Sequence, residues 1–388
     1  MRRLIYLIAV VALAVPSTAA AQSGTIAFEQ RAFDHSSSDL WLAAADGSTG
    51  AVPLTTPQSA PDPDACFESC AAEAPDWAPD GSRVFFDSSW APFVHIWSIK
   101  PDGSDARQET FSAGFDGFQS VSPDGSMVAY EYDDVDDPSL NGIYVEALGG
   151  GERIQLTSFP KRGLDTNPDF SPDGTKVVFQ RVEFNQCPPK GCGGRGETGF
   201  TSQVMVVGTD GSGLHKVLAG GQVWGDPHFS PDGSLILASS YWENRGRSHG
   251  TGSSLYTVRP DGSDMNRLTS SKDQVSFASD WSPDGSRIVF THYQFGDDHL
   301  QIRTIAADGS NPETVADCDP ELFCANPSWG VYDGPLPAAT IASSGARVRV
   351  SAAAAARGHR ARRLRRAIRR ELRGRSRAAS SRALRRGL

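Results

Sequence analysis

The 388-residue sequence contains only 4 methionines and 6 cysteines, and its one long apolar run ends at residue 15. A membrane-spanning helix needs about 20 apolar residues, so no later segment qualifies as one. The HExxH, P-loop and EF-hand patterns do not occur, and the chemistry that they mark has no support in the sequence. Glycine is abundant, with 39 residues, which suits a β protein of ordinary globular composition.

The first 21 residues have the pattern of a cleaved export signal. Two arginines come first, then an apolar run from Leu4 to Val15, then the small residues Ala19-Ala20-Ala21. A membrane anchor is the alternative, but the apolar run is shorter than the ~20 residues that a spanning helix needs. We predict a signal peptide at 1–21 and an exported, monomeric protein that is periplasmic or extracellular.

The cysteines occur as three close pairs: Cys66 with Cys70, Cys187 with Cys192, and Cys318 with Cys324. Six cysteines allow fifteen pairings, and in an oxidising compartment three local disulfides are the simplest of them. Zinc binding is the alternative, but the separations differ and no histidine accompanies any pair at ligand spacing. We predict the three local disulfides, no metal site and no cofactor.

One short phrase recurs five times along the chain. An aromatic residue or valine is followed by Ser-Pro-Asp-Gly, or once by Ala-Pro-Asp-Gly, and then by a run of β-branched and aromatic residues. Proline sets φ at the first central turn position, aspartate accepts backbone hydrogen bonds, and glycine adopts the left-handed conformation, so each phrase predicts a β-hairpin. The copies are Trp77-Ala78-Pro79-Asp80-Gly81, Val121-Ser122-Pro123-Asp124-Gly125, Phe170-Ser171-Pro172-Asp173-Gly174, Phe229-Ser230-Pro231-Asp232-Gly233 and Trp281-Ser282-Pro283-Asp284-Gly285.

A second turn, Asp-Gly-Ser, alternates with this phrase. The phrases are 44, 49, 59 and 52 residues apart, close to the ~40–45 residues of a four-stranded propeller blade once loop insertions are allowed. Each unit therefore reads as four strands, which we call A to D, with the proline turn between A and B and the Asp-Gly turn between C and D. The Asp-Gly-Ser turns begin at Asp46, Asp102, Asp210, Asp261 and Asp308.

The first unit has no strand A of its own. Asn326-Pro327-Ser328-Trp329 matches the pattern of a strand A and has no further strands after it. We expect it to pair beside Ile26-Ala27-Phe28, because this closure removes the exposed edges of an open sheet. Residues 22–336 thus predict an all-β fold, a six-bladed β-propeller of four-stranded blades, closed by pairing of the C-terminal strand with the first blade.

The repeated phrase, with its Asp-Gly-Ser turn and Arg-Leu-Thr-like last strand, resembles the TolB-type propeller repeat, also called the WD40-like or PD40 repeat, over residues 25 to about 330. Similar repeats occur in periplasmic scaffold proteins and in the propeller halves of prolyl-oligopeptidase-type peptidases. TolB carries a small α/β domain before its propeller, and here the first strand begins close to the predicted cleavage site, so the partner contacts of that domain are not carried over. The chain has no room for the hydrolase domain of the peptidases.

The strand order assigns a binding face. The B to C loops and the connections between blades share one end of the ring, and long loops on a rigid scaffold often carry binding sites. We predict a ligand site where strands A enter the channel from this end, with acidic and amide acceptors beside a tryptophan that suit a cationic or peptide ligand. The predicted site residues are Glu73, Asp165, Asn167, Trp224, Asp226, His228 and Asn326.

The charge is unevenly distributed. Residues 22–346 hold 45 acidic against 19 basic side chains, whereas 347–388 hold 16 arginines and one glutamate. The acidic body argues against nucleic acid as a partner of the propeller. We expect the Arg/Ala-rich tail, 337–388, to be disordered or to form a basic amphipathic helix that contacts anionic surfaces.

Two functions are open on this evidence. The first is an exported, non-catalytic binding or scaffold propeller that recognises a protein, peptide or glycan of the cell envelope at its loop-rich face. The alternative is an envelope hydrolase or lyase that uses carboxylates at the channel mouth, since a propeller can bring together residues from different blades. The sequence assigns no catalytic residue.

Overall fold

The computed structural model describes residues 23–337, apart from 34–36, 67–69, 92, 135, 159–162, 185–199, 220–222, 244–251, 271 and 273. In this part of the chain there are twenty-four strands and only three short 3-10 helices, η1 (Pro57–Ser59), η2 (Pro63–Ala65) and η3 (Pro138–Leu140). Of the helices described, none has the length and apolar character to cross a membrane. The predicted signal peptide and tail, and the pair Cys187 and Cys192, lie outside the described residues and stay predictions.

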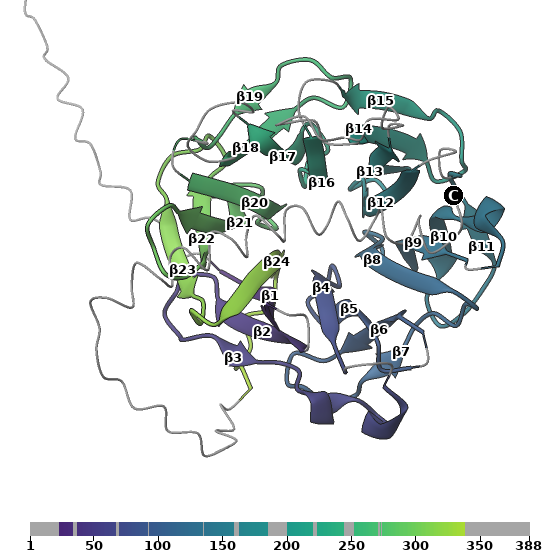
Figure 1. The fold of residues 1–388 in the computed structure, drawn as a ribbon, viewed down its shortest axis with the longest axis horizontal. Helices are drawn as coiled ribbons and strands as arrows, with labels where there is room; N and C mark the ends of the chain where they lie inside the picture. The colour runs from purple at the N-terminus through teal and green to yellow at the C-terminus, as the bar shows by residue number, and fades with distance from the viewer. Residues whose placement is uncertain are drawn as a thin grey trace, which may run out of the picture.

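The strands form meanders around a central channel (Figure 1). The innermost strands are β4 (Ala72–Trp77), β8 (Phe115–Val121), β12 (Gly163–Phe170), β16 (Val223–Phe229), β20 (Gln274–Trp281) and β24 (Leu322–Gly330). The second strands are β1 (Thr25–Ala32), β5 (Val84–Ser88), β9 (Met127–Asp133), β13 (Lys176–Phe184), β17 (Ile236–Glu243) and β21 (Arg287–Gln294). The third strands are β2 (Ser38–Ala44), β6 (His95–Ile99), β10 (Gly142–Ala147), β14 (Phe200–Gly208), β18 (Gly252–Val258) and β22 (Gln301–Ala306). The outer strands are β3 (Val52–Pro53), β7 (Arg107–Gln108), β11 (Arg153–Gln155), β15 (His215–Leu218), β19 (Asn266–Arg267) and β23 (Glu313–Asp317).

Four of the sheets have four strands each, in the orders β24-β1-β2-β3, β4-β5-β6-β7, β8-β9-β10-β11 and β12-β13-β14-β15. The fifth sheet runs from β16 to β23, and its two meanders are joined only by one parallel bridge between Ser253 and Val275. The predicted all-β propeller with four-stranded meanders is confirmed. In the first sheet, β24 pairs antiparallel with β1, and Trp329 lies opposite Ile26.

In the proline turns, the glycine and the aspartate adopt the conformation and make the hydrogen bonds that a hairpin turn needs. Between β16 and β17, the Gly233 backbone N–H donates to the Ser230 carbonyl at 2.7 Å, and Gly233 has φ +69°. The Asp232 carboxylate accepts the Ser234 backbone N–H at 3.0 Å and the Ser230 hydroxyl at 2.6 Å. The hydrogen bond from Ser230 and those from Ser234 lower the pKa of Asp232. These aspartates therefore serve the turn geometry, not a ligand.

Neighbouring proline turns also touch each other. A Cβ added to Gly233 would lie 3.2 Å from Cγ of Pro172, in the preceding turn. The same construction at Gly285 reaches Pro231 at 3.5 Å, so the glycine of one turn faces the proline of the turn before it. Glycine is thus required here both for φ and for the approach of adjacent sheets.

In four of the meanders, a threonine two residues after the last strand has the same structural role. Its hydroxyl accepts a backbone N–H from the third strand, 14 or 15 residues earlier, at 2.9 to 3.1 Å. This bond satisfies a backbone donor where the short outer strand ends. The pairs are Thr55 with Leu40, Thr110 with Ile96, Thr157 with Ile143, and Thr269 with Leu255.

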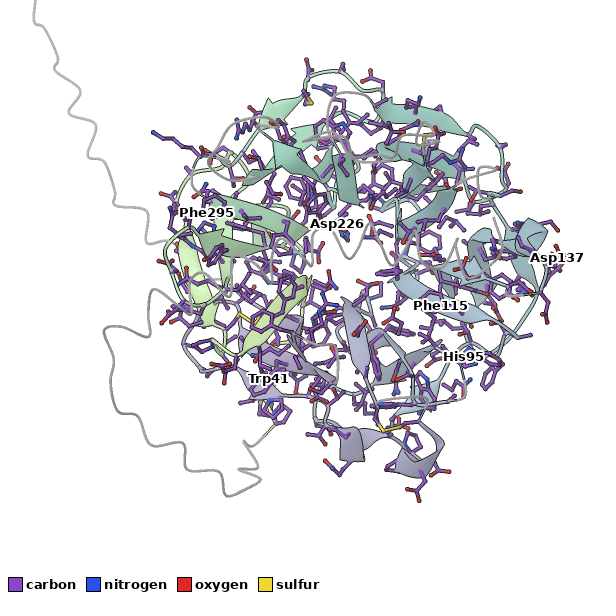
Figure 2. The ribbon with its side chains drawn as sticks, viewed as in Figure 1. Trp41, His95, Phe115, Asp137, Asp226 and Phe295 are labelled. Carbon is purple, nitrogen blue, oxygen red and sulfur yellow. A yellow bond between two sulfur atoms is a disulfide. The ribbon has the colours of Figure 1, made fainter. Side chains whose placement is uncertain are left out.

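The apolar core lies between adjacent meanders. One cluster joins Ile143 and Val145 of β10 to Phe170, Val177 and other residues of β12 to β14. Because both faces of a sheet pack on a neighbour, β5 is buried at every position and shows no alternation. Two disulfides, Cys66–Cys70 and Cys318–Cys324, close short loops as predicted, and both are drawn in Figure 2.

Candidate binding site in the central channel

All six innermost strands carry the same irregularity. Three residues before its final aromatic residue or valine, each has a non-glycine residue in the left-handed region, with φ between +46° and +54°. The pairing with the second strand shifts register there, which is the mark of a β-bulge. A bulge bends the strand and re-aims the side chains next to it. The residues are Ala74, Phe118, Asn167, Asp226, Ala278 and Asn326.

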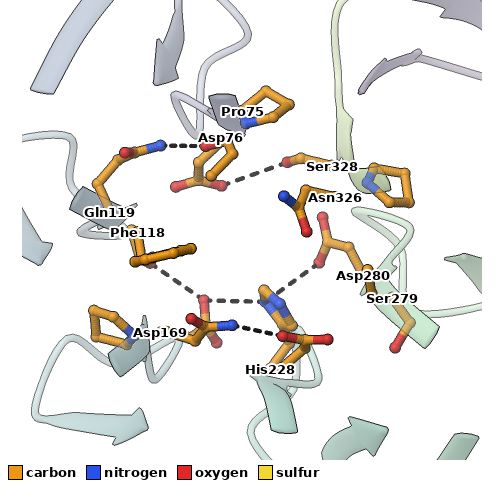
Figure 3. Close-up of a pocket in the computed structure, with 17 residues that line it drawn as sticks. Pro75, Asp76, Phe118, Gln119, Asp169, His228, Ser279, Asp280, Asn326 and Ser328 are labelled. Carbon is orange, nitrogen blue, oxygen red and sulfur yellow. Dashed lines mark hydrogen bonds and ion pairs between the residues drawn. The ribbon is translucent and has the colours of Figure 1, made fainter. Parts of the chain in front are cut away.

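The bulges surround a hollow of about 560 Å³ that is open to solvent (Figure 3). Its walls come from the bulge residues and the two positions after them on the six innermost strands, except that Pro227 does not line it. The position directly before the final aromatic residue or valine supplies most of the chemistry. It is occupied, in chain order, by Asp76, Ser120, Asp169, His228, Asp280 and Ser328.

The three aspartates at this position link neighbouring meanders. Oδ2 of Asp76 accepts the Val121 backbone N–H at 2.9 Å. Oδ2 of Asp169 accepts the Phe229 N–H at 2.8 Å in the same way. Oδ2 of Asp280 accepts the Trp329 N–H at 3.0 Å. One carboxylate oxygen of each aspartate thus holds the next innermost strand in place.

The second oxygens lie among the other polar groups of the hollow. Oδ1 of Asp76 accepts the Ser328 hydroxyl at 3.4 Å, and Oδ1 of Asp169 accepts the Ser120 hydroxyl at 3.2 Å. His228 lies between two carboxylates, with Nδ1 3.7 Å from Oδ1 of Asp169 and 3.9 Å from Oδ1 of Asp280. Both contacts are within ion-pair range but longer than a hydrogen bond.

The aspartates and the histidine shift one another's pKa values. Burial lowers the pKa of His228, but Asp169, with Asp280 and Asp226, outweighs burial and raises it to about 9. Burial and the neighbouring Asp280 carboxylate raise the pKa of Asp76 to about 7, and burial also raises the pKa of Asp280. Near neutral pH, His228 is therefore an imidazolium among acidic side chains, and Asp76 changes its charge close to this pH.

A further carboxylate, Asp226, lies two positions before His228 on β16. Its Oδ1 accepts the Asn167 side-chain amide at 2.5 Å, and its Oδ2 accepts the Tyr241 hydroxyl. The channel-lining Asn326 donates its amide to Glu29 of β1 at 2.9 Å. These bonds fix the polar side chains on the wall, so the hollow is preorganised and needs little rearrangement to present its acceptors.

The structure brings four of the seven predicted site residues together: Asn167, Asp226, His228 and Asn326 line the hollow. The other three do not line it. Asp165 is fully buried and binds Arg181 at 2.6 and 2.7 Å, and its hydrogen bonds raise the pKa of that arginine. Trp224 is buried and packs edge-on against Tyr256, with ring centroids 5.3 Å apart. Glu73 lies opposite Asp87 in the pairing of β4 with β5.

The sequence prediction missed the three aspartates that face His228 or share its position. Asp76, Asp169 and Asp280 stand directly before an aromatic residue, as His228 does, so the repeat register itself was the available signal. Simple alternation along a strand would place Asp165 and Asn167 on one face. The bulge at Asn167 breaks this alternation, and it cannot be recognised from the residue types alone.

No group of three or more His, Cys, Asp or Glu side chains among the described residues is arranged to hold a metal ion. The hollow is lined by oxygen acceptors and contains one imidazolium, that of His228. Charged groups in a partly desolvated channel interact more strongly than they do in bulk water.

Four-stranded meanders with repeated proline turns, arranged around a central channel, define a β-propeller. The chain belongs to the TolB beta propeller domain family, whose sequence model matches residues 122–333.

Several known proteins are similar to this chain. An uncharacterized protein of Agrobacterium fabrum (strain C58) is 32% identical over 115 residues, which are 28% of this chain and 39% of that protein. The Tol-Pal system protein TolB of Bordetella pertussis is 32% identical over 109 residues, 27% of this chain and 23% of that protein. The matches therefore span less than half the length of either relative. The crystal structure of TolB from Acinetobacter baumannii has a TM-score of 0.59 at 18% identity and covers 80% of this chain and 67% of that one, which shows a shared fold.

Proposed function

We propose that the protein is an exported, non-catalytic propeller that binds a protein partner of the cell envelope at its acidic channel. We count six blades in the ring, because the two meanders of the eight-stranded sheet share only the bridge between Ser253 and Val275. The pairing of β24 with β1 is the closure of that ring.

The acidic hollow is the observation that carries this proposal. Asp76, Asp169 and Asp280 each use one oxygen to hold a backbone N–H of the next strand, which fixes the other oxygen relative to the channel axis. A lysine or arginine side chain, or an amino terminus, is the group that this arrangement complements. Glycans offer hydroxyl groups but no positive charge, and we therefore favour a protein or peptide partner.

The envelope location has two supports. A Tol-Pal system protein of Bordetella pertussis is similar over part of its length, and the disulfides Cys66–Cys70 and Cys318–Cys324 suit an oxidising compartment. The predicted export signal at 1–21 agrees with both.

One observation weighs against the hydrolase or lyase alternative. A histidine whose pKa is raised to about 9 is protonated near neutral pH and is a poor general base there.

A capture experiment with matched charge variants tests the proposal. The immobilised full chain is exposed to envelope extract at low and at moderate salt, and the bound proteins are identified and quantified. Asp169→Asn with Asp280→Asn keeps an acceptor oxygen at both positions but removes two ionisable carboxyl groups from the hollow. The matched control, Glu152→Gln with Glu321→Gln, removes two exposed charges from outside it.

We expect the hollow variant to lose at least tenfold in capture of a specific partner, and the control to keep it. Capture should also weaken as salt rises, since the attraction is between charges that solvent partly screens. Equal capture by the two variants would exclude the channel as the binding site.

A further inference from the structure

The position directly before the final residue of each proline-turn strand alternates in kind around the hollow. Aspartate stands at the first, third and fifth of these positions in chain order, and Ser120, His228 and Ser328 stand at the others. The innermost strands follow one another around the channel in chain order (Figure 1), so each aspartate has a residue with a hydrogen-bond donor on either side. The serines are uncharged donors: Ser328 donates to Asp76 at 3.4 Å, and Ser120 to Asp169 at 3.2 Å. His228 differs from them because it brings a positive charge.

The His228 imidazole lies between two carboxylates without a close hydrogen bond to either. Nδ1 is 3.7 Å from Oδ1 of Asp169 on β12 and 3.9 Å from Oδ1 of Asp280 on β20 (Figure 3). Of these two oxygens, that of Asp280 also accepts the Trp281 backbone N–H, at 2.7 Å. The imidazole is therefore in ion-pair contact with both carboxylates but is not locked to them, because both distances exceed that of a hydrogen bond.

Four acidic side chains act on this imidazole. Asp169 and Asp280 face it from the two neighbouring innermost strands, Asp226 precedes it on β16, and Asp76 on β4 interacts with it electrostatically. Burial lowers the pKa of His228, but Asp169, with Asp280 and Asp226, raises it to about 9. The side chain is 33% exposed. Near neutral pH, the hollow thus already contains a cation that solvent can reach.

We propose that the His228 imidazolium is an internal counter-cation that competes with the basic group of the partner for Asp169 and Asp280, and so sets the affinity of the hollow. This inference rests on the proposed function, because it concerns the same carboxylates. A lysine or arginine side chain that reaches them also approaches the imidazolium, and the repulsion between like charges offsets part of the attraction. Once the imidazole is neutral, the repulsion disappears and the carboxylates remain.

The same contact has a role when no partner is bound. Carboxylates that converge in a partly desolvated channel repel one another, and a cation among them reduces this repulsion. The basic group of a partner would do the same when it binds. His228 therefore stabilises the empty propeller and weakens capture, and a neutral side chain at this position should shift the balance towards binding.

Binding of a basic probe to charge variants of His228 tests the inference. The probe is an acetylated tetra-arginine amide with a rhodamine label, because arginine keeps its charge over the whole pH range used. Fluorescence anisotropy at low salt measures its Kd for the full chain near pH 8 and near pH 10, both above the range in which Asp76 changes its charge. His228→Gln removes the positive charge. His228→Lys keeps it, since lysine has an ordinary pKa of about 10.4 and neighbouring carboxylates favour its charged form.

Near pH 8, we expect His228→Gln to bind the probe about tenfold more tightly than the unaltered chain, a difference of ~1.4 kcal/mol. The unaltered chain should gain most of this affinity between pH 8 and pH 10, because its imidazole loses its proton through about pH 9. The His228→Lys variant should bind as weakly as the unaltered chain does near pH 8, and neither variant should gain affinity as the pH rises. His215→Gln removes an exposed imidazole from β15 and should follow the unaltered chain.

Asp169→Asn with Asp280→Asn separates this inference from the proposed function. If this pair weakens probe binding but His228→Gln does not change it, the counter-cation is refuted and the hollow remains the binding site. If the pair leaves probe binding unchanged, the probe binds elsewhere and the proposed function fails as well. Equal gains for the glutamine and lysine variants would show that side-chain shape limits access, which also refutes the inference. Circular dichroism melting curves at both pH values show whether each variant is folded.

Discussion

Replacing His228 by glutamine should destabilise the propeller in acid but not in alkali. The imidazole lies 3.7 Å from Asp169 and 3.9 Å from Asp280, and these carboxylates raise its pKa from 6.5 to about 9. Such a rise corresponds to about 3 kcal/mol at ~1.4 kcal/mol per pH unit. Because 33% of the side chain is exposed, solvent screening reduces the expected contribution to about 1–2 kcal/mol.

The direction follows from proton linkage. A histidine whose pKa is higher in the folded than in the unfolded state stabilises the fold fully below its ordinary value of 6.5. That contribution disappears as the pH rises through about 9, where the folded-state imidazolium loses its proton. His228→Gln should therefore lower the free energy of unfolding by about 1–2 kcal/mol near pH 6, and the two proteins should converge near pH 10.

Urea unfolding at these two pH values, followed by tryptophan fluorescence and circular dichroism, measures the difference. His215→Gln is the matched control, because His215 is exposed on β15 and its Nδ1 lies 2.8 Å from the Gly213 carbonyl, away from the channel carboxylates. An equal loss at both pH values would mean that His228 acts by packing. A loss in the control as large as in the variant would refute the role of the channel carboxylates.

Three further predictions concern the scaffold. Gly233→Ala should lower the free energy of unfolding by about 1 kcal/mol more than Gly125→Ala does. Both glycines have φ +69°, but only a Cβ at position 233 meets the preceding turn, at 3.2 Å from Pro172. Equal losses would show that the turns do not press on each other. Ala278→Gly should change the free energy of unfolding by less than about 0.5 kcal/mol, since relief of the left-handed conformation offsets the added entropy of the unfolded chain. Ala238→Gly, in a regular buried strand, should lower it by at least about 1 kcal/mol. Chemical unfolding of both variants compares them. Ending the chain at residue 320 removes β24 and should abolish cooperative thermal unfolding, while ending it at 337 should leave the transition unchanged; a shorter chain that melts like the longer one would refute the closure by β24.

Much of the fold can be predicted from the sequence because its determinants are local. A proline, an aspartate and a glycine in fixed order define each hairpin turn through φ and hydrogen bonds to nearby backbone groups, as the turn at Gly233 illustrates. The repeat then sets the four-stranded meander, and close cysteine pairs such as Cys66 and Cys70 need only a short loop to meet. Local geometry was sufficient for each of these predictions.

The candidate site depends on contacts that no local pattern encodes. His228 lies 59 residues after Asp169 and 52 residues before Asp280 in the sequence. The three side chains meet only because three meanders converge on one axis. The bulges also decide which residues face the channel: Asp165 turns to Arg181, whereas Asp169 faces the hollow. The sequence by itself therefore determined the turns, the strands and the repeat, since these follow from backbone preferences of neighbouring residues. Only the tertiary structure decided the composition and charge of the channel, because burial and the field of distant carboxylates exist only once the ring is formed.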